Sequence, residues 1–385
     1  MKKSLFAVAT LSALASTAQA QSSVTLYGIV DEGINYVSNA GGHRQFALKS
    51  GVMQGSRWGL RGTEDLGGGM HALFVLENGF DASNGSLGQG GLEFGRQAYV
   101  GLSSGLGTVT LGRQYDSVVD FVGPFEAGDQ WGGYIASHPG DLDNFNNFNR
   151  VNNAIKFTSA NYAGFTFGGV YSLGGVAGNF NRNQIWSVGA GYANGPLMLG
   201  VAYLNVKNPN TSFFGNNGGA LTAAGNNMAG SPVFAGYASA HTQQVIGAGA
   251  SYKFGAATVG ATYSNTKFKD LGDLSSGPNP LGYSGTATFN NAEVNFKYQL
   301  TPSLLLGVAY DYTKGSSAAK AKYHQASLGA DYFLSKRTDV YVVGVYQKAS
   351  GTDSTGKDAV ASISALTPSS GDRQATVRLG IRHKF

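Results

Sequence analysis

The strongest constraint on the fold is a repeated unit, in which roughly ten residues alternate between apolar and polar types before a turn follows. The C-terminal unit shows it clearly: Val377, Leu379 and Ile381 alternate with small or basic residues, and the pattern continues to Phe385 at the end of the chain. An alternation of period two is typical of a β-strand with one apolar face. The sequence therefore predicts an all-β protein whose last strand runs to its final residue.

Two kinds of connection separate these units, and they alternate along the chain. Seven are short and rich in residues that tolerate tight backbone geometry, namely 66–69, 104–107, 160–163, 193–196, 254–256, 300–303 and 334–337. Eight are longer and polar, at 39–45, 82–91, 114–149, 174–182, 208–240, 269–285, 315–321 and 350–371. These connections predict sixteen strands, an even number that places both termini on the short-turn side, where the first and last strands can pair.

The placement of charge indicates which face of the predicted sheet meets lipid. In the segment 197–204, Leu197, Leu199, Val201 and Tyr203 on one face alternate with Met198, Gly200, Ala202 and Leu204 on the other. In the same way, Trp58 and Leu60 alternate with Arg57, Gly59 and Arg61. Charges therefore lie opposite the large apolar side chains, as in a barrel with lipid outside and water inside. A soluble barrel would reverse this arrangement, and a soluble β-sandwich does not predict the rhythm of connections. We expect a 16-stranded antiparallel transmembrane β-barrel with short periplasmic turns and long extracellular loops.

The N-terminus indicates export. Lys2 and Lys3 precede an apolar run at 5–15, and Ala18 and Ala20 form a small-x-small cleavage site, so residues 1–20 are predicted to be a secretory signal peptide and 21–385 the mature barrel. The absence of cysteine excludes disulfides and thiolate metal sites. Removing the two lysines of the signal peptide lowers the formal charge from +5 to +3, too mild a charge to predict nucleic-acid binding in an exported protein.

Four segments in order resemble the general porins of β-proteobacterial outer membranes: "VTLYGIVDEGINYV" (24–37), "SRWGLRGTEDLGGG" (56–69), "RQAYVGLSSGLGTVTLGRQYD" (96–116) and "LGIRHKF" (379–385). The resemblance implies a homotrimeric diffusion channel in the Gram-negative outer membrane, in contact with lipids and lipopolysaccharide. It further implies that the third long loop folds into the lumen and that the barrel-assembly machinery reads Phe385. The loops 208–240 and 350–371 match no motif of the family.

The third long link, 114–149, carries an acidic pattern without Lys or Arg. Its carboxylates are Asp116, Asp120, Glu126, Asp129, Asp141 and Asp143, of which the first four are predicted to face the pore. Strand alternation gives Arg57, Arg96 and Arg150 inward positions, each at nearly the same number of residues from the next short turn. Three arginines at one depth opposite an acidic loop would create a transverse field that filters ions, with a moderate preference for anions.

Further residues are predicted to line the lumen. Arg61 and Lys156 would lie lower on the same basic wall, and the other inward candidates are Tyr27, Asp31, Glu77, Lys253, Arg378 and Arg382. Arg113 has outward parity at the base of the loop, and Glu32 has outward parity on the first strand. Because a charge facing lipid is costly, Glu32 suggests that another subunit covers this wall.

Signals for chemistry are weak. "GLSSG" (101–105) matches a nucleophile-elbow pattern, but a hairpin follows it instead of a helix. The six histidines show no metal-ligand spacing, so no bound metal and no cofactor are expected, and the pair Asp141 and Asp143 only faintly resembles a cation site. The favoured function is passive flux of ions and small hydrophilic solutes, without catalysis. The alternatives are an adhesin or enzyme on a barrel scaffold and a substrate-specific sugar or nutrient channel, for which the loop offers Phe121, Phe125, Trp131 and Tyr134.

Overall fold

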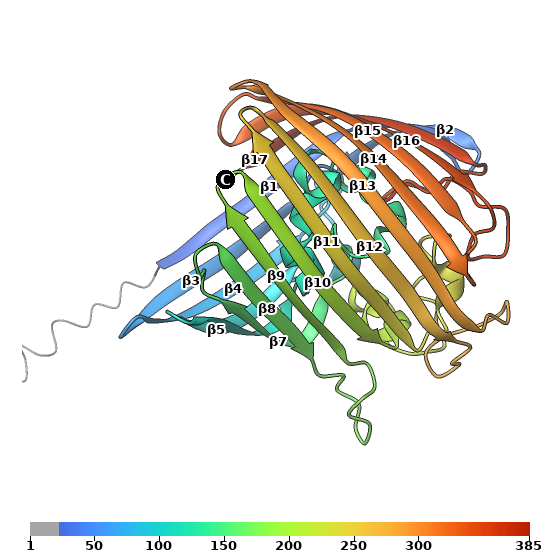
Figure 1. Cartoon of the computed structure of the whole chain (residues 1–385), viewed down its shortest axis with the longest axis horizontal. Coiled ribbons are helices and arrows are strands. Elements are labelled where there is room, and N and C mark those ends of the chain that lie inside the picture. The colour runs from blue at the N-terminus through green and yellow to red at the C-terminus, as the bar shows by residue number, and fades with distance from the viewer. Residues whose placement is uncertain (1–22) are drawn as a thin grey trace, which may run out of the picture.

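The computed structural model describes residues 23–385 as one antiparallel sheet closed into a barrel of tilted strands (Figure 1). The first strand, β1 (Ser23–Ala40), pairs with the last, β17 (Arg373–Lys384), with Gly33 opposite Gly380. The amide of Phe385 donates to the carbonyl of Gly28 at 3.1 Å. Closure pairs both edge strands of the sheet, as the sequence predicted. The predicted signal peptide lies outside the described residues.

The sheet has seventeen strand segments that occupy sixteen positions around the barrel. Both β2 (His43–Ser50) and β3 (Arg57–Gly67) pair with β1, β2 along one half and β3 along the other, so they form one interrupted barrel strand. Gly51, at φ +71°, begins the interruption at 51–56. The predicted number of strands is therefore confirmed, whereas the break was not foreseen.

The strands differ in length around the barrel. The short wall, β3 to β8, has strands of 8 to 11 residues, whereas the long wall, β11 to β16, has strands of 12 to 17. These strands and the two between the walls are β4 (Met70–Gly79), β5 (Gln97–Ser104), β6 (Gly107–Gln114), β7 (Val151–Ser159), β8 (Phe165–Ser172), β9 (Ile185–Asn194), β10 (Leu197–Lys207), β11 (Thr242–Phe254), β12 (Ala257–Leu271), β13 (Gly285–Thr301), β14 (Leu304–Ser317), β15 (Lys322–Phe333) and β16 (Thr338–Ser350). Among residues 23–385, no helix is both long and apolar enough to cross a membrane.

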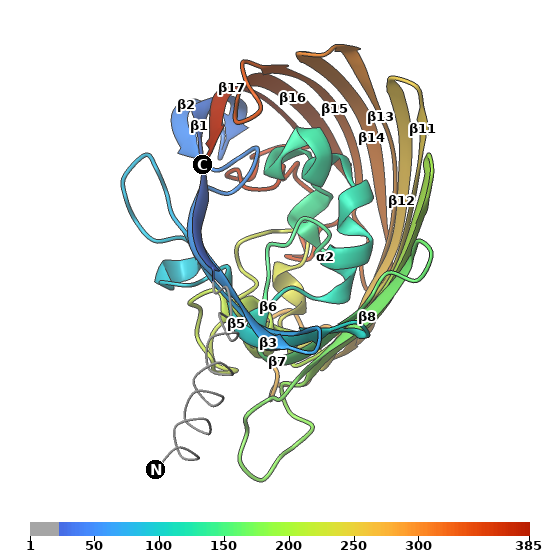
Figure 2. The same ribbon diagram turned by 90° about the vertical axis from the view of Figure 1, so that its left-hand side faces the viewer.

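The inserted loop, residues 115–150 between β6 and β7, lies inside the ring of strands (Figure 2). It contains α2 (Ser117–Phe121) and the short helices η2 (Gly123–Phe125), η3 (Gly128–Gly132), η4 (Tyr134–Ala136) and η5 (Pro139–Asp141). Its aromatic side chains pack on glycines of the barrel wall. A Cβ added to Gly307 would lie 2.2 Å from Trp131, and one added to Gly249 would lie 2.4 Å from Phe125. Glycine at these positions makes room for the loop.

Two further loops cover the inserted loop. The loop 208–240, with α3 (Pro209–Ser212), η6 (Phe214–Asn216) and η7 (Ala235–Tyr237), contributes Met228 and Phe234 to a buried cluster that includes Leu142 of the inserted loop. From the loop 350–371, Ile363 packs in a cluster with Ile135. The sequence assigned no role to these loops, whereas in the structure they help to hold the inserted loop in place. The remaining short helix, η1 (Gln89–Gly91), lies between β4 and β5.

Candidate functional site: the inserted loop between two walls

Arg96 lies directly before β5 and is neutralised by a carboxylate of the neighbouring strand. Its Nε donates to Glu77 Oε1 at 2.8 Å, and its Nη2 donates to the hydroxyl of Tyr115 at 3.1 Å. The hydroxyl of Tyr27 donates to the other oxygen of Glu77 at 3.0 Å. Arg96 and Glu77 are both buried, so this pair shapes the wall more than it meets passing solutes.

Arg150 differs from Arg96 because no acid pairs with it among residues 23–385. Its Nη1 donates to the carbonyl of Phe148 at 3.1 Å, its guanidinium lies 5.9 Å from the ring centre of Tyr115, and its Nε and Nη2 have no hydrogen-bond partner among the described residues. The side chain is buried, so it does not lie open to the lumen as predicted.

A backbone irregularity interrupts the strand alternation from which Arg150 was placed. Asn153 has a φ of +51°, and both Val151 and Ala154 are buried in one cluster, so the alternation assumed for residues 150–156 is broken between them. The parity argument that placed Arg150 was therefore wrong, although the end of the inserted loop still brings it beside Arg96.

Tyr134 of the inserted loop lies where the three arginines meet. Burial alone would raise the pKa of its hydroxyl, but Arg96, Arg150 and Arg57 together lower that pKa below its ordinary value. Arg57, half-buried on β3, also interacts electrostatically with Asp129 of the loop. The structure thus brings the three predicted arginines together around one tyrosine.

Among the four loop carboxylates predicted to face the pore, only Asp129 is exposed. Asp116 is fully buried, where it caps α2 by accepting from the amide of Val118 at 2.8 Å, and burial raises its pKa to about 6. Asp120 is partly buried and pairs with Lys156 at 2.5 Å. The fourth, Glu126, is fully buried behind the loop. The prediction was therefore wrong for Asp116 and Glu126, because their carboxylates stabilise the fold of the loop itself.

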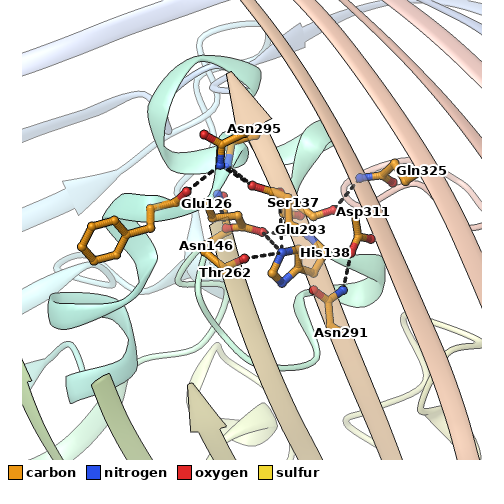
Figure 3. Close-up of polar contacts among 12 residues, drawn as sticks. Glu126, Ser137, His138, Asn146, Thr262, Asn291, Glu293, Asn295, Asp311 and Gln325 are labelled. Atoms are coloured by element: carbon orange, nitrogen blue, oxygen red, sulfur yellow. Dashed lines mark hydrogen bonds and ion pairs between the residues drawn. The ribbon is translucent and has the colours of Figure 1, made fainter. Parts of the chain in front are cut away.

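Glu126 belongs to a buried cluster on the side of the loop that faces the long wall (Figure 3). His138 Nδ1 lies 2.7 Å from Asp143 Oδ2, and its Nε2 lies 3.8 Å from Glu126 Oε1 and 3.6 Å from Glu293 Oε2. Burial and the neighbouring carboxylates raise the pKa of Glu126 well above its usual range. Asp141 accepts from two loop amides. Both members of the predicted pair Asp141 and Asp143 are thus inside the loop's own hydrogen-bond network.

The other predicted lumen residues fall into two groups. Asp31 and Arg378 are inward but fully buried, joined at 2.9 Å, and Arg382 is buried against Asp339 at 2.9 Å. These three residues therefore do not meet the open lumen as predicted, because partners from neighbouring strands or the segment 51–56 cover them. Lys253 is exposed and lines a recess of about 900 Å³ near the short turns. Arg61 is exposed, with its guanidinium 5.2 Å from the ring centre of Tyr27.

Arg113 was singled out from the sequence at the base of the loop, whereas Glu293 and His138, which also organise the site, were not. Arg113 ties the base of the inserted loop to its surroundings, because it donates to the Gly95 carbonyl at 2.8 Å and to Asn217 Oδ1 at 3.0 Å. Glu293 shares inward parity with its strand neighbours, a signal that could have identified it. His138 gave no such signal, because its nearby partner Asp143 lies in an irregular loop and Glu293 is distant in sequence.

Comparisons with known proteins agree with this architecture. A family model of Gram-negative porins matches residues 7–352. An outer membrane porin protein of Bordetella pertussis is 34% identical over 394 residues, covering 90% of this chain and 94% of that protein. Outer membrane porin protein 32 of Delftia acidovorans is 34% identical over 404 residues, covering both chains completely. Among solved structures, an anion-selective porin from Comamonas acidovorans superposes with a TM-score of 0.72 at 25% identity, covering 94% of this chain and all of that one.

Proposed function

Because the chain belongs to the Gram-negative porin family and forms an outer-membrane β-barrel, we propose that it is a general diffusion pore with a preference for anions. The observation that carries the proposal is an imbalance of uncompensated charge. On the basic wall, Arg57 and Arg61 form no ion pair within residues 23–385. Of the acidic residues described in the inserted loop, only Asp129 is exposed. A fixed positive field in a narrowed lumen favours anions.

Arg150 supports this preference from behind the pore surface. Its guanidinium is buried without a carboxylate partner in the described part of the chain, and in a low-dielectric setting such a charge is weakly screened. Arg96 contributes less, because Glu77 neutralises it. The relative from Comamonas acidovorans is called anion-selective, which points to the same sign.

The test is the reversal potential of the purified protein in a planar bilayer across a salt gradient. We expect anion selectivity in the wild type, a reduced preference in Arg57→Ser and Arg150→Ser, and a smaller reduction in Arg96→Ser. Arg373→Ser is the matched control, since Arg373 is exposed beside Asp372 at the start of β17. The preference should weaken as the Debye length falls from about 10 Å at 0.1 M salt to about 3 Å at 1 M. A cation-selective wild type would contradict the proposal. So would unchanged selectivity in a variant that combines Arg57→Ser, Arg96→Ser and Arg150→Ser.

A substrate-specific sugar channel would need free aromatic side chains along the lumen. Phe125 and Trp131 are instead buried against glycines of the wall, and the ring of Phe121 packs on Gly189. Three of the four aromatic residues that kept this alternative open are therefore used to anchor the loop. This observation favours the general diffusion pore.

We also propose that the pore has no catalytic activity. The strands place Ser103 opposite His71, and His71 opposite Asp65, which superficially resembles a catalytic triad. The distance from His71 Nδ1 to Asp65 Oδ1 is 3.9 Å, too long for a hydrogen bond. Since no hydrogen bond links Ser103 to His71 among residues 23–385, these three residues lack the geometry that activates a nucleophile.

We propose that the functional unit is a homotrimer, in contact with outer-membrane lipids and lipopolysaccharide. The support is the shared family and the partly exposed Glu32, whose carboxylate has only a serine of the loop between β4 and β5 as a side-chain partner in the described chain. Light scattering after mild detergent extraction should give the mass of three chains. A purely monomeric protein under those conditions would exclude this assembly.

We further propose that Phe385 is an assembly signal read by the barrel-assembly machinery. In the folded barrel its ring lies over Gly28 but is 44% exposed, so its removal should cost the barrel less than the about 3 kcal/mol of a fully buried aromatic. Deleting Phe385 should therefore reduce the amount in the outer membrane far more than it lowers the unfolding midpoint of refolded protein. Normal amounts in the membrane would contradict this role.

A further inference from the structure

Three potential metal ligands converge in a buried position between the inserted loop and the long wall. Glu126 and His138 come from the loop and Glu293 comes from β13, and one ligand atom from each lies within 4.8 Å of the other two (Figure 3). All three side chains are buried. This group lies behind the loop and is separate from the arginines of the short wall.

The cluster is short of positive charge. Glu126, Asp143 and Glu293 all surround the single imidazole of His138, and none of them forms an ion pair with Lys or Arg within residues 23–385. Two buried carboxylate oxygens, Glu293 Oε2 and Asp143 Oδ1, have no hydrogen-bond partner among the described residues. Because buried carboxylates are stabilised by pairing or by metal coordination, a bound cation would compensate the unpartnered Glu293 oxygen.

The hydrogen bonds around the cluster prepare its atoms for coordination. Asp143 engages Nδ1 of His138 at 2.7 Å, which directs Nε2 toward the two glutamates. The amide of Ala127 and the side chain of Asn295 donate to Glu293 Oε1 at 2.8 and 2.7 Å, which leaves Oε2 facing Nε2. A carboxylate behind a metal-binding histidine is a recurrent arrangement that fixes the ring and raises its basicity.

The distances suit a small transition-metal ion. Nε2 of His138 lies 3.6 Å from Glu293 Oε2 and 3.8 Å from Glu126 Oε1. Tetrahedral Zn²⁺, with bonds near 2.0–2.1 Å, separates its ligand atoms by about 3.4 Å, so the two distances from Nε2 exceed the ideal by a few tenths of an ångström. The two carboxylate oxygens lie within 4.8 Å of each other and would move closer together around an ion. The hydroxyl oxygen of Thr262 also lies near the cluster, 3.4 Å from Nε2 of His138. A mixed nitrogen and oxygen set of this kind favours Zn²⁺ over Ca²⁺ or Mg²⁺, which prefer oxygen alone.

We propose that Glu126, His138 and Glu293 bind a divalent transition-metal ion, with Zn²⁺ as the best match, and that the ion ties the inserted loop to β13. The ion takes the place of the proton on Nε2 of His138, and Asp143 positions the imidazole. The sequence predicted no metal, because residues 126, 138 and 293 do not occur in a recognisable ligand spacing. Only the docking of the loop on the long wall brings them together.

The test starts from unfolded protein, because a site buried in this way is filled most readily as the loop docks. The full mature chain is refolded in detergent with Zn²⁺ or Co²⁺, passed over a chelating resin, and analysed for metal by mass spectrometry. We expect one ion per chain in the wild type and its loss in His138→Gln and Glu293→Gln. Asp143→Asn should weaken Zn²⁺ binding about 10- to 100-fold while leaving the stoichiometry at saturation unchanged.

The matched control is His241→Gln. His241 forms a similar pair with Asp273 at 2.8 Å, but no second acid pairs with it among the described residues, so this variant should retain the ion. Should the ligand variants fail to refold, the visible spectrum of Co²⁺ in the wild type decides between the outcomes. Bands of low-symmetry nitrogen and oxygen coordination support the site. A wild type without stoichiometric metal, a spectrum of hydrated Co²⁺, or equal loss of metal in His241→Gln would overturn it.

Discussion

The inserted loop meets two walls, and it uses charge differently on each. Toward the short wall, Arg150 and Tyr134 of the loop meet Arg57 and Arg96, and among the described loop acids only Asp129 is exposed. Toward the long wall it presents Glu126 and His138 to Glu293 in a buried polar cluster (Figure 3). In each of the two regions, several charged groups lie close together.

The difference lies in what remains available to water. On the long wall, burial forces the charges into mutual contact, since an unpaired buried charge would cost several kcal/mol. On the short wall, Arg57 and Arg61 remain in contact with the lumen, where a solute can meet them. The loop is therefore anchored on one side by groups removed from the pore, which leaves the other side free to set the selectivity.

The largest effect is expected when the buried pair on the short wall is broken. Glu77→Gln leaves Arg96 without its carboxylate, and removing one partner of a buried ion pair costs about 3–5 kcal/mol. The free energy of unfolding, measured by urea titration of the refolded barrel, should fall by that amount while anion preference rises. Asp372→Asn, which breaks the exposed pair with Arg373, is the control and should cost less than about 1 kcal/mol. Equal losses would mean that burial does not distinguish these pairs.

An intermediate effect is expected from overpacking the loop's apolar contact with the long wall. In Gly307→Ala the new methyl would lie 2.2 Å from Trp131, and overpacking costs about 1–3 kcal/mol. Gly344→Ala is the control, because its Cβ would meet nothing closer than 3.9 Å. We expect the first variant alone to shift the tryptophan fluorescence to the red and to change the single-channel conductance. A silent Gly307→Ala would show that the loop does not depend on this contact.

A smaller effect should separate the exposed loop acid from a buried one. Asp129→Asn removes the carboxylate that faces Arg57 and should increase the anion preference measured by reversal potential. Asp116→Asn removes a carboxylate within the loop, where Asn can still cap α2, and should leave the reversal potential nearly unchanged. If both variants shift the potential equally, burial inside the loop does not hide a charge from the pore.

The smallest effect is expected from Lys156→Met. Lys156 and Asp120 are paired at 2.5 Å with side chains 14% and 28% exposed, so water partly screens the pair, and we expect it to contribute about 1 kcal/mol, less than the buried pair of Glu77 and Arg96. The unfolding midpoint in urea should hardly move, whereas the anion preference should fall because Asp120 is left uncompensated. A loss of stability similar to that of Glu77→Gln would place this pair with the buried ones.

Much of the fold could be predicted from local patterns. The alternation of apolar and polar residues, together with the order of short and long connections, gave the number of barrel strands and the closure of β1 on β17. The break at 51–56 was missed, because β2 and β3 each alternate normally and only their shared pairing with β1 reveals one interrupted strand. The shift at Asn153 was missed because one residue with a positive φ reverses which side chains point inward, while the residue types on either side give no sign of it.

The sequence by itself determined which residues are charged, which strands carry them, and that the third long loop is acidic. The alternation of apolar and polar residues is a local property of each strand, so it can be recognised in the sequence. Only the tertiary structure decided which charges stay available. The neutralisation of Arg96 by Glu77, the burial of Asp116 and Glu126, and the meeting of His138 with Glu293 all depend on contacts between segments far apart in the chain. Burial and pairing are properties of those contacts, and they set the electrostatic character of the pore.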